Sequence, residues 1–358
     1  MFSLVPALGL ADIQRWFRGS KITPELQSGY GDYFWTTGGA ESLSIIAELI
    51  SSSRDRVINI YLPAYFCGQS LRFLRSPNIK LCFYELDKGL LPDYSSIISA
   101  CDINPVDVFV HVHYFGKVAG QESSRDLADK LGAVLIEDCA HVISPFALKV
   151  WKGDYLIFSP HKHFPLPKVS FVVSRDGHKM IESRKKDGFP FVWFLKQPFK
   201  KILFRKSFTK WGLVWTEITE NTNPMDINLL VKRTTMSYLW DFENFNFRRK
   251  KNTEKLIEKL SEIEGWKPLM DDDHVIAPYI LGMICDSEEI AKKRFYALNE
   301  NFQIVMQWPD LPFEIKDTNL QHQASMLVGR TLFFFTHHKI ELDRLLHALD
   351  NLIKINDF

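Results

Sequence analysis

Cysteine is scarce in this chain. Its 358 residues include only five cysteines, and no two of them form a Cys-x-x-Cys pair. An odd and unclustered set offers neither a disulfide framework nor a zinc site, and it is typical of proteins whose thiols stay reduced. We therefore expect a cytoplasmic protein without a bound structural metal.

Long hydrophobic runs are missing as well. No uncharged apolar stretch reaches the roughly 20 residues that span a bilayer, and the start, MFSLVPALGLADIQRWF, lacks the basic region and cleavage site of a secretory signal. The formal net charge of +1 argues against nucleic acid as a general partner. The chain also contains no Gly-x-Gly-x-x-Gly, P-loop or His-Glu-x-x-His signature. These absences leave a globular enzyme or binding protein.

What the chain does contain is an alternation of apolar runs and helix-like stretches. The expected strands are residues 57–63, 80–86, 106–116, 133–138, 155–159 and 170–174, with helices that include residues 41–52 and 123–132. Apolar strands separated by helices predict an α/β fold whose parallel or mixed sheet is covered on both faces.

The pattern changes after about residue 244. A charged helix at 247–265, a strand at 277–285 and a closing helix at 341–354 indicate a smaller α+β unit. We therefore expect a large domain of residues 1–244 and a small C-terminal domain of residues 245–358.

The segment 188–216 is set apart by its charge. Its first 28 residues, up to Trp215, contain no Asp or Glu, while aromatic side chains alternate with the basic residues Lys196, Lys200, Lys201, Arg205, Lys206 and Lys210. The simpler interpretation is an amphipathic excursion that packs on the domain or on a partner chain. The alternative is a weak contact of residues 191–215 with an anionic membrane surface or a lipid-linked substrate.

A glycine pair precedes the first expected helix, in WTTGGAESL (Trp35–Leu43). Gly38 and Gly39 allow a tight turn, and the amides of Ala40 and Glu41 would then be free donors at a helix N-terminus, which suits a phosphate. Alone, such a pair is more often a simple turn.

Aromatic residues follow the strand that ends at Pro63. Tyr65, Phe66 and Cys67 come directly after it, at the edge of the sheet where ligands bind in open α/β folds. A flat side chain here could stack on a planar cofactor, although packing in the core is the favoured interpretation of this segment alone.

Acidic residues end another strand, in LIEDCAH (Leu135–His141). Asp138 could hold the proton of a pyridine nitrogen, and His141 could reach a neighbouring ring oxygen. The same acid could instead cap the following helix. The residues leave both interpretations open.

A lysine ends the next strand, in IFSPHKHFPLP (Ile157–Pro167). Ser159 could bind a phosphate while Lys162 forms an imine with an aldehyde. An apolar, proline-rich setting should lower the pKa of Lys162 and favour its free amine.

The order of phosphate turn, aromatic, Asp and Ser-x-x-Lys resembles the DegT/StrS family of pyridoxal-phosphate-dependent sugar aminotransferases. LGAVLIEDCAH is similar to that family's Ile-Glu-Asp motif, and GDYLIFSPHK is similar to its lysine strand. The resemblance implies the fold-type I architecture. This is a large domain with a mainly parallel, seven-stranded sheet between helices, and a small C-terminal α+β domain.

The resemblance also implies roles. Lys162 and Asp138 would be catalytic, with Lys162 attached to the cofactor and moving protons, and Asp138 paired with the pyridinium nitrogen. The residues implied to bind pyridoxal 5'-phosphate are Gly39, Ala40, Glu41, Phe66, Cys67, Asp138, His141, Ser159 and Lys162. Cys67 falls at the family's ring-stacking position, whereas the aromatic argument favours Phe66 or Tyr65.

Two features depart from the family pattern. Ser159 and Lys162 are three residues apart, where the family commonly has five, and Lys168 and Val169 replace a Gly-Gly pair. Relatives in which the lysine is a histidine carry out dehydration, so the retained Lys162 favours transamination.

We therefore expect a homodimeric aminotransferase. It would move an amino group from glutamate to a keto-sugar, nucleotide-linked in the simplest case, in surface polysaccharide or amino-sugar biosynthesis. Trp308 and His338 are candidates for substrate contacts. The alternatives are other pyridoxal phosphate chemistry, such as sugar dehydration, and a non-catalytic sensor or binding protein on the same fold.

Overall fold

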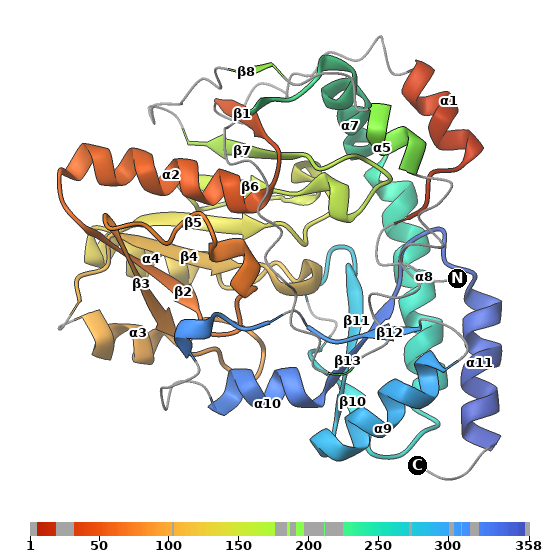
Figure 1. The fold of residues 1–358 in the computed structure, drawn as a ribbon. Helices are drawn as coiled ribbons and strands as arrows, with labels where there is room; N and C mark the ends of the chain where they lie inside the picture. The colour runs from red at the N-terminus through yellow and green to blue at the C-terminus, as the bar shows by residue number, and fades with distance from the viewer. Residues whose placement is uncertain are drawn as a thin grey trace.

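The computed structural model describes most of the chain (Figure 1). The described residues are 6–18, 32–101, 104–175, 185–186, 191–196, 211, 225–271, 274–300, 304–308, 310–315 and 322–354. Of the aromatic and basic segment 188–216, only the helix α5 (Phe191–Lys196) and Trp211 are among them. The role expected for the rest of that segment stays a prediction.

A seven-stranded sheet forms the centre of the molecule, in the order β1-β7-β6-β5-β4-β2-β3. Its strands are β1 (Tyr33–Thr36), β2 (Ile58–Pro63), β3 (Ile79–Tyr84), β4 (Val108–Val112), β5 (Val134–Cys139), β6 (Tyr155–Phe158) and β7 (Ser170–Ser174). The pairs among β2 to β6 are parallel, whereas β7 runs antiparallel to both β6 and β1. The expected mixed α/β sheet and its six expected strands are confirmed.

One expected strand is too long. The apolar run 106–116 predicts a strand up to Gly116, but β4 ends at Val112 and residues 114–116 form a 3-10 turn. The chain reverses there because Phe115 has a φ of 55° and Gly116 a φ of 92°. This turn brings the end of β4 against the C-terminal part of the chain, since Tyr279 N donates to Phe115 O at 3.0 Å.

Helices cover both faces of the sheet (Figure 1). The helix α2 (Gly39–Arg54) packs on β2, β6 and β7, and α4 (Gln121–Leu131) packs on β4 and β5. The helix α3 (Tyr94–Cys101) follows β3. His111 Nδ1 on β4 lies 2.7 Å from Ser124 Oγ on α4. The side chains on the same face of β4 as His111 therefore point toward α4.

A second, antiparallel sheet lies in the C-terminal part, in the order β10-β11-β13-β12. Its strands are β10 (Trp266–Pro268), β11 (Ile280–Cys285), β12 (Val305–Met306) and β13 (Thr331–Phe335). The helices around it are α8 (Phe242–Leu260), α9 (Glu288–Asn299), α10 (His322–Arg330) and α11 (Leu342–Lys354). The helix α7 (Leu229–Trp240), which precedes α8, lies away from this sheet (Figure 1). The proposed division of the chain at residue 244 would fall two residues after the start of α8, and it stays a prediction.

At the other end of the chain, α1 (Leu10–Arg18) lies beside α5 and α7 (Figure 1). The short strands β8 (Lys185–Lys186) and β9 (Met225–Asp226) pair with each other. Among the described residues, no helix combines the length and the apolar character needed to cross a membrane.

Candidate active site

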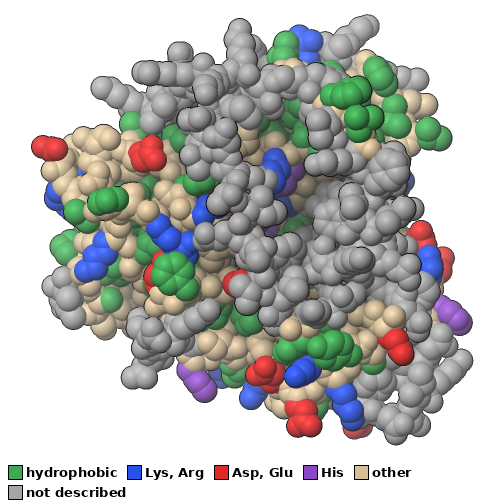
Figure 2. Space-filling model, in the orientation of Figure 1, with side chains coloured by type: hydrophobic (Ala, Val, Ile, Leu, Met, Phe, Trp, Pro, Cys, Tyr) green, Lys and Arg blue, Asp and Glu red, His purple; other side chains and the backbone are tan. Residues whose placement is uncertain are grey.

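A cavity of about 330 Å³ opens at the carboxyl ends of β4, β5 and β6, beside the N-terminus of α2. Figure 2 shows basic side chains and histidine at the bottom of a hollow in the middle of this face. The residues predicted from the sequence all line it: Gly39, Ala40, Glu41, Phe66, Cys67, Asp138, His141, Ser159 and Lys162. Tyr279, Ile280, Met306 and Trp308, from the C-terminal part, complete the wall. The roles of these residues stay predictions.

Hydroxyl groups fix the N-terminus of α2 to the sheet. The hydroxyl oxygens of Thr36 and Ser42 lie 2.7 Å apart, and those of Ser42 and Ser170 lie 3.1 Å apart. Ser170 in turn donates to Phe158 O at 2.6 Å. Because none of these bonds uses a backbone N–H group of α2, the first N–H groups of the helix remain available as donors.

Ser159 lies beside those free amides. A Cβ atom at Gly39 would come within 3.0 Å of the Ser159 hydroxyl oxygen, so glycine keeps this corner open. Gly38 is the N-cap, and no side chain caps the helix there. The N-terminal amides of α2 and the Ser159 hydroxyl therefore face the same part of the cavity. This arrangement suits a phosphate group.

The side chain of Glu41 turns back toward the preceding residues. Its carboxylate accepts hydrogen bonds from Thr37 N at 2.7 Å and from Thr37 Oγ1 at 2.5 Å. This leaves a negative charge in the first turn of α2, where an anion would bind. Arg72 and Lys168, which line the same cavity, supply positive charge there.

The short spacing between Ser159 and Lys162 has a structural reason. Pro160–Lys162 form a 3-10 turn, and Lys162 N donates to Ser159 O at 3.0 Å. In a 3-10 turn, side chains three residues apart lie on the same side. Ser159 and Lys162 therefore both reach the cavity. The loop that follows is closed by His161 Nδ1, which donates to Val169 O at 2.7 Å.

Lys162 and Asp138 keep contact with the cavity but are otherwise enclosed by protein. Burial lowers the pKa of Lys162, and the charges of Asp138 and Cys67 act in the opposite direction. Burial also raises the pKa of Asp138, against the charge of Lys162 and a hydrogen bond from Ala140 N at 2.9 Å. Both groups are thus moved toward their neutral forms.

Glu137 and Asp138 point to opposite faces of the sheet, as neighbours on a strand must. Glu137 is fully buried and accepts from His113 Nε2 at 2.7 Å and from the amides of Lys152 and Gly153. Gly153 is required here because a Cβ would lie 2.8 Å from Tyr155 O. The Glu of the Ile-Glu-Asp motif is therefore structural, and Asp138 alone faces the cavity.

His141 is held between two aromatic rings. Its imidazole stacks on Tyr279 with centroids 4.6 Å apart, and Phe115 lies 5.6 Å away, nearly parallel. Burial, with the charges of Lys162 and His163, holds its pKa well below the ordinary value. Phe115 N donates to Nδ1 at 3.3 Å. This assigns the neutral tautomer with its proton on Nε2, which is a donor.

The three residues after β2 take different positions. Tyr65 is buried and stacks on Trp308, with ring centroids 4.9 Å apart and planes at 20°. Cys67 keeps more exposure than Phe66 and bears electrostatically on Lys162 and Tyr279. Tyr65 is therefore part of the wall, and Phe66 and Cys67 remain the candidates to contact a planar ligand.

Of the two suggested substrate contacts, only Trp308 is among the described residues that line the cavity. His338 packs its ring on Phe245, with ring centroids 4.5 Å apart, and burial together with the charge of Arg249 lowers its pKa to about 2. Its suggested contact with a substrate stays a prediction.

Arg249 does not line the cavity but supports two segments that do, and sequence reasoning missed it. Its guanidinium is fully buried in α8 and donates to the carbonyl oxygens of Pro278 and Tyr279 at 3.2 Å and of His163 at 3.1 Å. Burial lowers its pKa to about 10. Arg249 ties the residue after Lys162 to the residue that stacks on His141. No local pattern around Arg249 signals this contact.

Solved structures resemble this chain over its full length. Helicobacter pylori PseC, an aminotransferase involved in the biosynthesis of pseudoaminic acid, has a TM-score of 0.71 and 13% identity, covering 99% of both chains. NtdA from Bacillus subtilis, with bound cofactor PMP, has a TM-score of 0.67 and 15% identity, covering 98% of this chain and 83% of that one. DesI in the presence of its TDP-sugar product has a TM-score of 0.63 and 15% identity, covering 97% of this chain and 85% of that one.

No protein-family model and no curated protein matches the sequence. The structural neighbours are pyridoxal-phosphate-dependent aminotransferases of fold-type I, and their likeness extends over almost the whole chain. The chain therefore has the fold-type I architecture, as expected. At this low identity the likeness establishes the fold, and the activity must be argued from the cavity.

Proposed function

We propose that this protein is a pyridoxal-phosphate-dependent aminotransferase. It would transfer the amino group of glutamate to a keto-sugar, nucleotide-linked in the simplest case, in surface polysaccharide or amino-sugar biosynthesis. The observation that carries the proposal is the meeting of Lys162, Asp138, Ser159 and the N-terminus of α2 in one cavity. As in other fold-type I enzymes, two chains would form the working unit.

The chemistry of the donor set fits pyridoxal phosphate. The uncapped start of α2 and the Ser159 hydroxyl suit its phosphate. Asp138 accepts one hydrogen bond from the described residues, that of Ala140 N, and its remaining oxygen is available to a ring N–H. Because burial raises the pKa of Asp138, a cationic partner would stabilise its ionised form. The neutral His141 would donate from Nε2 to a ring oxygen.

Bound pyridoxal phosphate supplies an aldehyde and an electron-withdrawing ring. The chain itself supplies the proton transfers. Lys162 Nζ would take a proton from the α carbon of the amino donor and return one to the acceptor carbon, acting as base and then as acid. A lowered pKa favours the free amine that acts as the base, and the ammonium group formed in that step can then act as the acid. Asp138 would hold the ring proton during both transfers.

The walls of the cavity would keep water away from these transfers. Trp308 meets the rings of His141 and Phe115 edge-on, at 5.8 and 5.4 Å, and stacks on Tyr65. These aromatic residues come from both the central sheet and the C-terminal part. Exclusion of water strengthens the interaction between Asp138 and a cation bound in the cavity.

The test is an absorbance titration. Purified protein would be mixed with pyridoxal phosphate, and its yellow absorbance would be followed before and after glutamate is added. We expect absorbance that forms in the wild type, bleaches with glutamate, and fails to form in Lys162→Ala. Lys130→Ala is the matched control, because Lys130 at the end of α4 is exposed and is not among the residues that line the cavity, and it should keep the response.

Borohydride reduction followed by peptide mapping identifies the lysine that reacts. A reduced adduct on Lys162 supports the proposal, and one on Lys168 alone contradicts it. Absorbance that forms on Lys162 but ignores glutamate would point to another donor or to other pyridoxal phosphate chemistry. Absence of any lysine-dependent absorbance would leave a binding protein on this fold.

A further inference from the structure

The hydroxyl of Tyr279 is a polar group of the cavity wall that has no partner in the protein. The residue directly precedes β11, lines the cavity and is only 4% exposed. Its hydroxyl oxygen forms no hydrogen bond with any described residue, yet it keeps access to the cavity. A nearly buried polar group without a partner costs free energy. A ligand that accepts a hydrogen bond from this hydroxyl would recover that cost.

Tyr279 is held firmly in place. Its backbone N–H donates to Phe115 O at 3.0 Å. Its carbonyl oxygen accepts from Arg249 Nη1 at 3.2 Å and from Thr336 Oγ1 at 3.1 Å. Its ring is fixed as well, because it stacks on the imidazole of His141 with centroids 4.6 Å apart. The hydroxyl is therefore a preorganised donor that needs no rearrangement to meet a ligand.

The hydroxyl lies at the end of the cavity that holds the proton-transferring lysine. The thiol of Cys67 bears electrostatically on both Tyr279 and Lys162. The charge of Lys162 bears in turn on His141. Such effects weaken with distance, so these four side chains are gathered at one end. Since His141 Nε2 would serve the ring oxygen of the cofactor, the hydroxyl of Tyr279 is left for an oxygen of the substrate.

The surroundings of Tyr279 indicate what kind of oxygen this is. Among the described residues of the C-terminal part, those that line the cavity with it are Ile280, Met306 and Trp308, and none of them is charged. Burial raises the pKa of Tyr279, so the phenol stays protonated and acts as a donor. A neutral donor in an uncharged wall suits a carbonyl oxygen or a water molecule. A carboxylate or phosphate is better matched by a cation.

We propose that Tyr279 is a further catalytic residue, whose hydroxyl donates a hydrogen bond to the oxygen that the reacting carbon of the substrate gains or loses. This inference rests on the proposed function. In the first half of the reaction, the reacting carbon of glutamate exchanges its bond to nitrogen for the oxygen of water, and the two protons of that water go to the nitrogen. The carbon is then the keto carbon of 2-oxoglutarate. In the second half the exchange runs backwards, and the keto oxygen of the acceptor leaves as water. Tyr279 stabilises the charge that develops on this oxygen.

The test follows two events in a single turnover with glutamate. Bleaching of the yellow absorbance reports the proton transfers by Lys162, and rapid-quench measurement of 2-oxoglutarate reports the exchange of nitrogen for oxygen. The wild type would be compared with Tyr279→Phe, which removes only the hydroxyl. The matched control is Tyr84→Phe, because Tyr84 is also buried but does not line the cavity, and its hydroxyl donates to Val110 O at 2.6 Å.

We expect Tyr279→Phe to bleach at the wild-type rate but to release 2-oxoglutarate about tenfold to a hundredfold more slowly, and the control to keep both rates. Urea unfolding gives a second readout. Tyr279→Phe should keep the wild-type midpoint, because its hydroxyl has no partner among the described residues, whereas Tyr84→Phe should unfold at lower urea.

Unchanged release of 2-oxoglutarate by Tyr279→Phe would overturn this role. So would a decrease of both rates together with a lower urea midpoint, since that result would show a structural hydroxyl. A wild type that does not bleach with glutamate would overturn the proposed function itself, and this inference with it.

Discussion

Burial shifts the pKa values of Asp138 and Lys162, which both line the cavity, in opposite directions. It raises the pKa of the acid and lowers that of the base. In the free protein, each therefore depends on the other to remain charged. A ligand that brings its own positive charge to Asp138 would release Lys162 as a free amine.

Substitution of Asp138 by Asn tests this coupling. It removes the carboxylate that would hold the ring proton, so we expect the bleaching by glutamate to slow by at least about a hundredfold. Because Asp138 raises the pKa of Lys162, its loss should lower that pKa further, which shifts adduct formation to lower pH. Stopped-flow absorbance over a pH series measures both effects. Asp129→Asn, at an exposed position on α4, should change neither, and an unaltered rate in Asp138→Asn would contradict the assigned role.

Arg249 is the second residue whose replacement is informative. Lysine keeps its charge but cannot reach the carbonyls of His163, Pro278 and Tyr279 together, so we expect Arg249→Lys to lower the free energy of unfolding by about 1–3 kcal/mol. Urea unfolding measures this loss. The neighbour Arg248 is exposed, and Arg248→Lys should stay within about 0.5 kcal/mol of the wild type. Equal stability of the two variants would show that the buried guanidinium contributes little.

At the scale of the elements, the turn after β4 joins the central sheet to the C-terminal part. Gly116 has a φ of 92°, and a Cβ there would lie 2.2 Å from Ala277 O. Gly132, after α4, also has a positive φ of 64° but has nothing within 4 Å. A comparison of alanine variants at these two glycines therefore separates the cost of backbone strain from the cost of a steric clash.

We expect Gly116→Ala to cost about 3 kcal/mol or more of unfolding free energy, because the alanine adds a clash to the strain. Gly132→Ala should cost only the strain, about 1–2 kcal/mol. Urea unfolding of both variants provides the comparison. If Gly116→Ala lost no more unfolding free energy than Gly132→Ala, the backbone at Ala277 would be able to move and accommodate the added methyl group.

Sequence patterns predicted the central strands because each is an apolar run bounded by polar residues. They missed β1 (Tyr33–Thr36) and β12 (Val305–Met306), which are four and two residues long and carry too little periodicity to detect. The order of the sequence motifs likewise predicted that Asp138, Ser159 and Lys162 lie together, since each is at the end of a strand or shortly after one.

The rest of the cavity could not be predicted in this way. Tyr279 and Met306 line the cavity only because the C-terminal part folds over the sheet edge, and Arg249 supports Tyr279 through its backbone carbonyl. Arg249 is 86 residues from His163 in the chain, and they meet through a backbone carbonyl, which any residue type could provide. Such contacts leave no spacing or composition for a pattern to detect.

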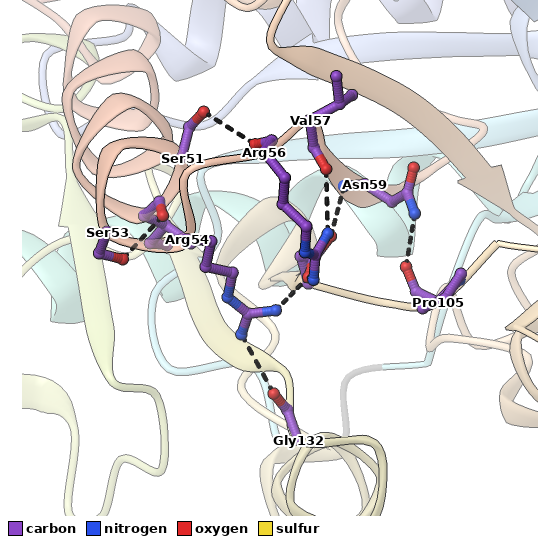
Figure 3. Close-up of polar contacts among 10 residues, drawn as sticks. Ser51, Ser53, Arg54, Arg56, Val57, Asn59, Pro105 and Gly132 are labelled. Atoms are coloured by element: carbon purple, nitrogen blue, oxygen red, sulfur yellow. Dashed lines mark hydrogen bonds and ion pairs between the residues drawn. The ribbon is translucent and has the colours of Figure 1, made fainter.

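For the whole molecule, an ion cluster holds the edge of the sheet opposite the cavity (Figure 3). Asp107 is 1% exposed and accepts from Arg54, from Arg56 at 2.5 and 2.9 Å, and from Asn59 N at 2.8 Å. Burial alone would raise the pKa of Asp107, but the bond from Arg56, the Asn59 amide and the two positive charges outweigh it and lower the pKa. This cluster joins the end of α2 to the starts of β2 and β4.

Asp107→Asn should therefore lower the free energy of unfolding by about 2–3 kcal/mol at neutral pH. A depressed pKa stabilises the fold fully above the unfolded value, near about 4, and this stabilisation is lost as the pH falls through the folded value. The difference between wild type and variant should thus shrink in acid, as followed by thermal unfolding over a pH series. Asp129→Asn, whose carboxylate is 67% exposed, should stay within about 0.5 kcal/mol. A difference that does not depend on pH would contradict this role.

The cavity wall also has a consequence for the order of events during synthesis. All seven strands of the central sheet lie before residue 175, whereas Tyr279, Met306 and Trp308 are made more than a hundred residues later. A nascent chain can pair the central sheet while it is still attached to the ribosome, since domains fold from the N-terminus during translation. Its ligand pocket stays open on one side until the last quarter of the chain emerges. A cofactor enclosed by this wall would therefore be captured only after Trp308 has been made.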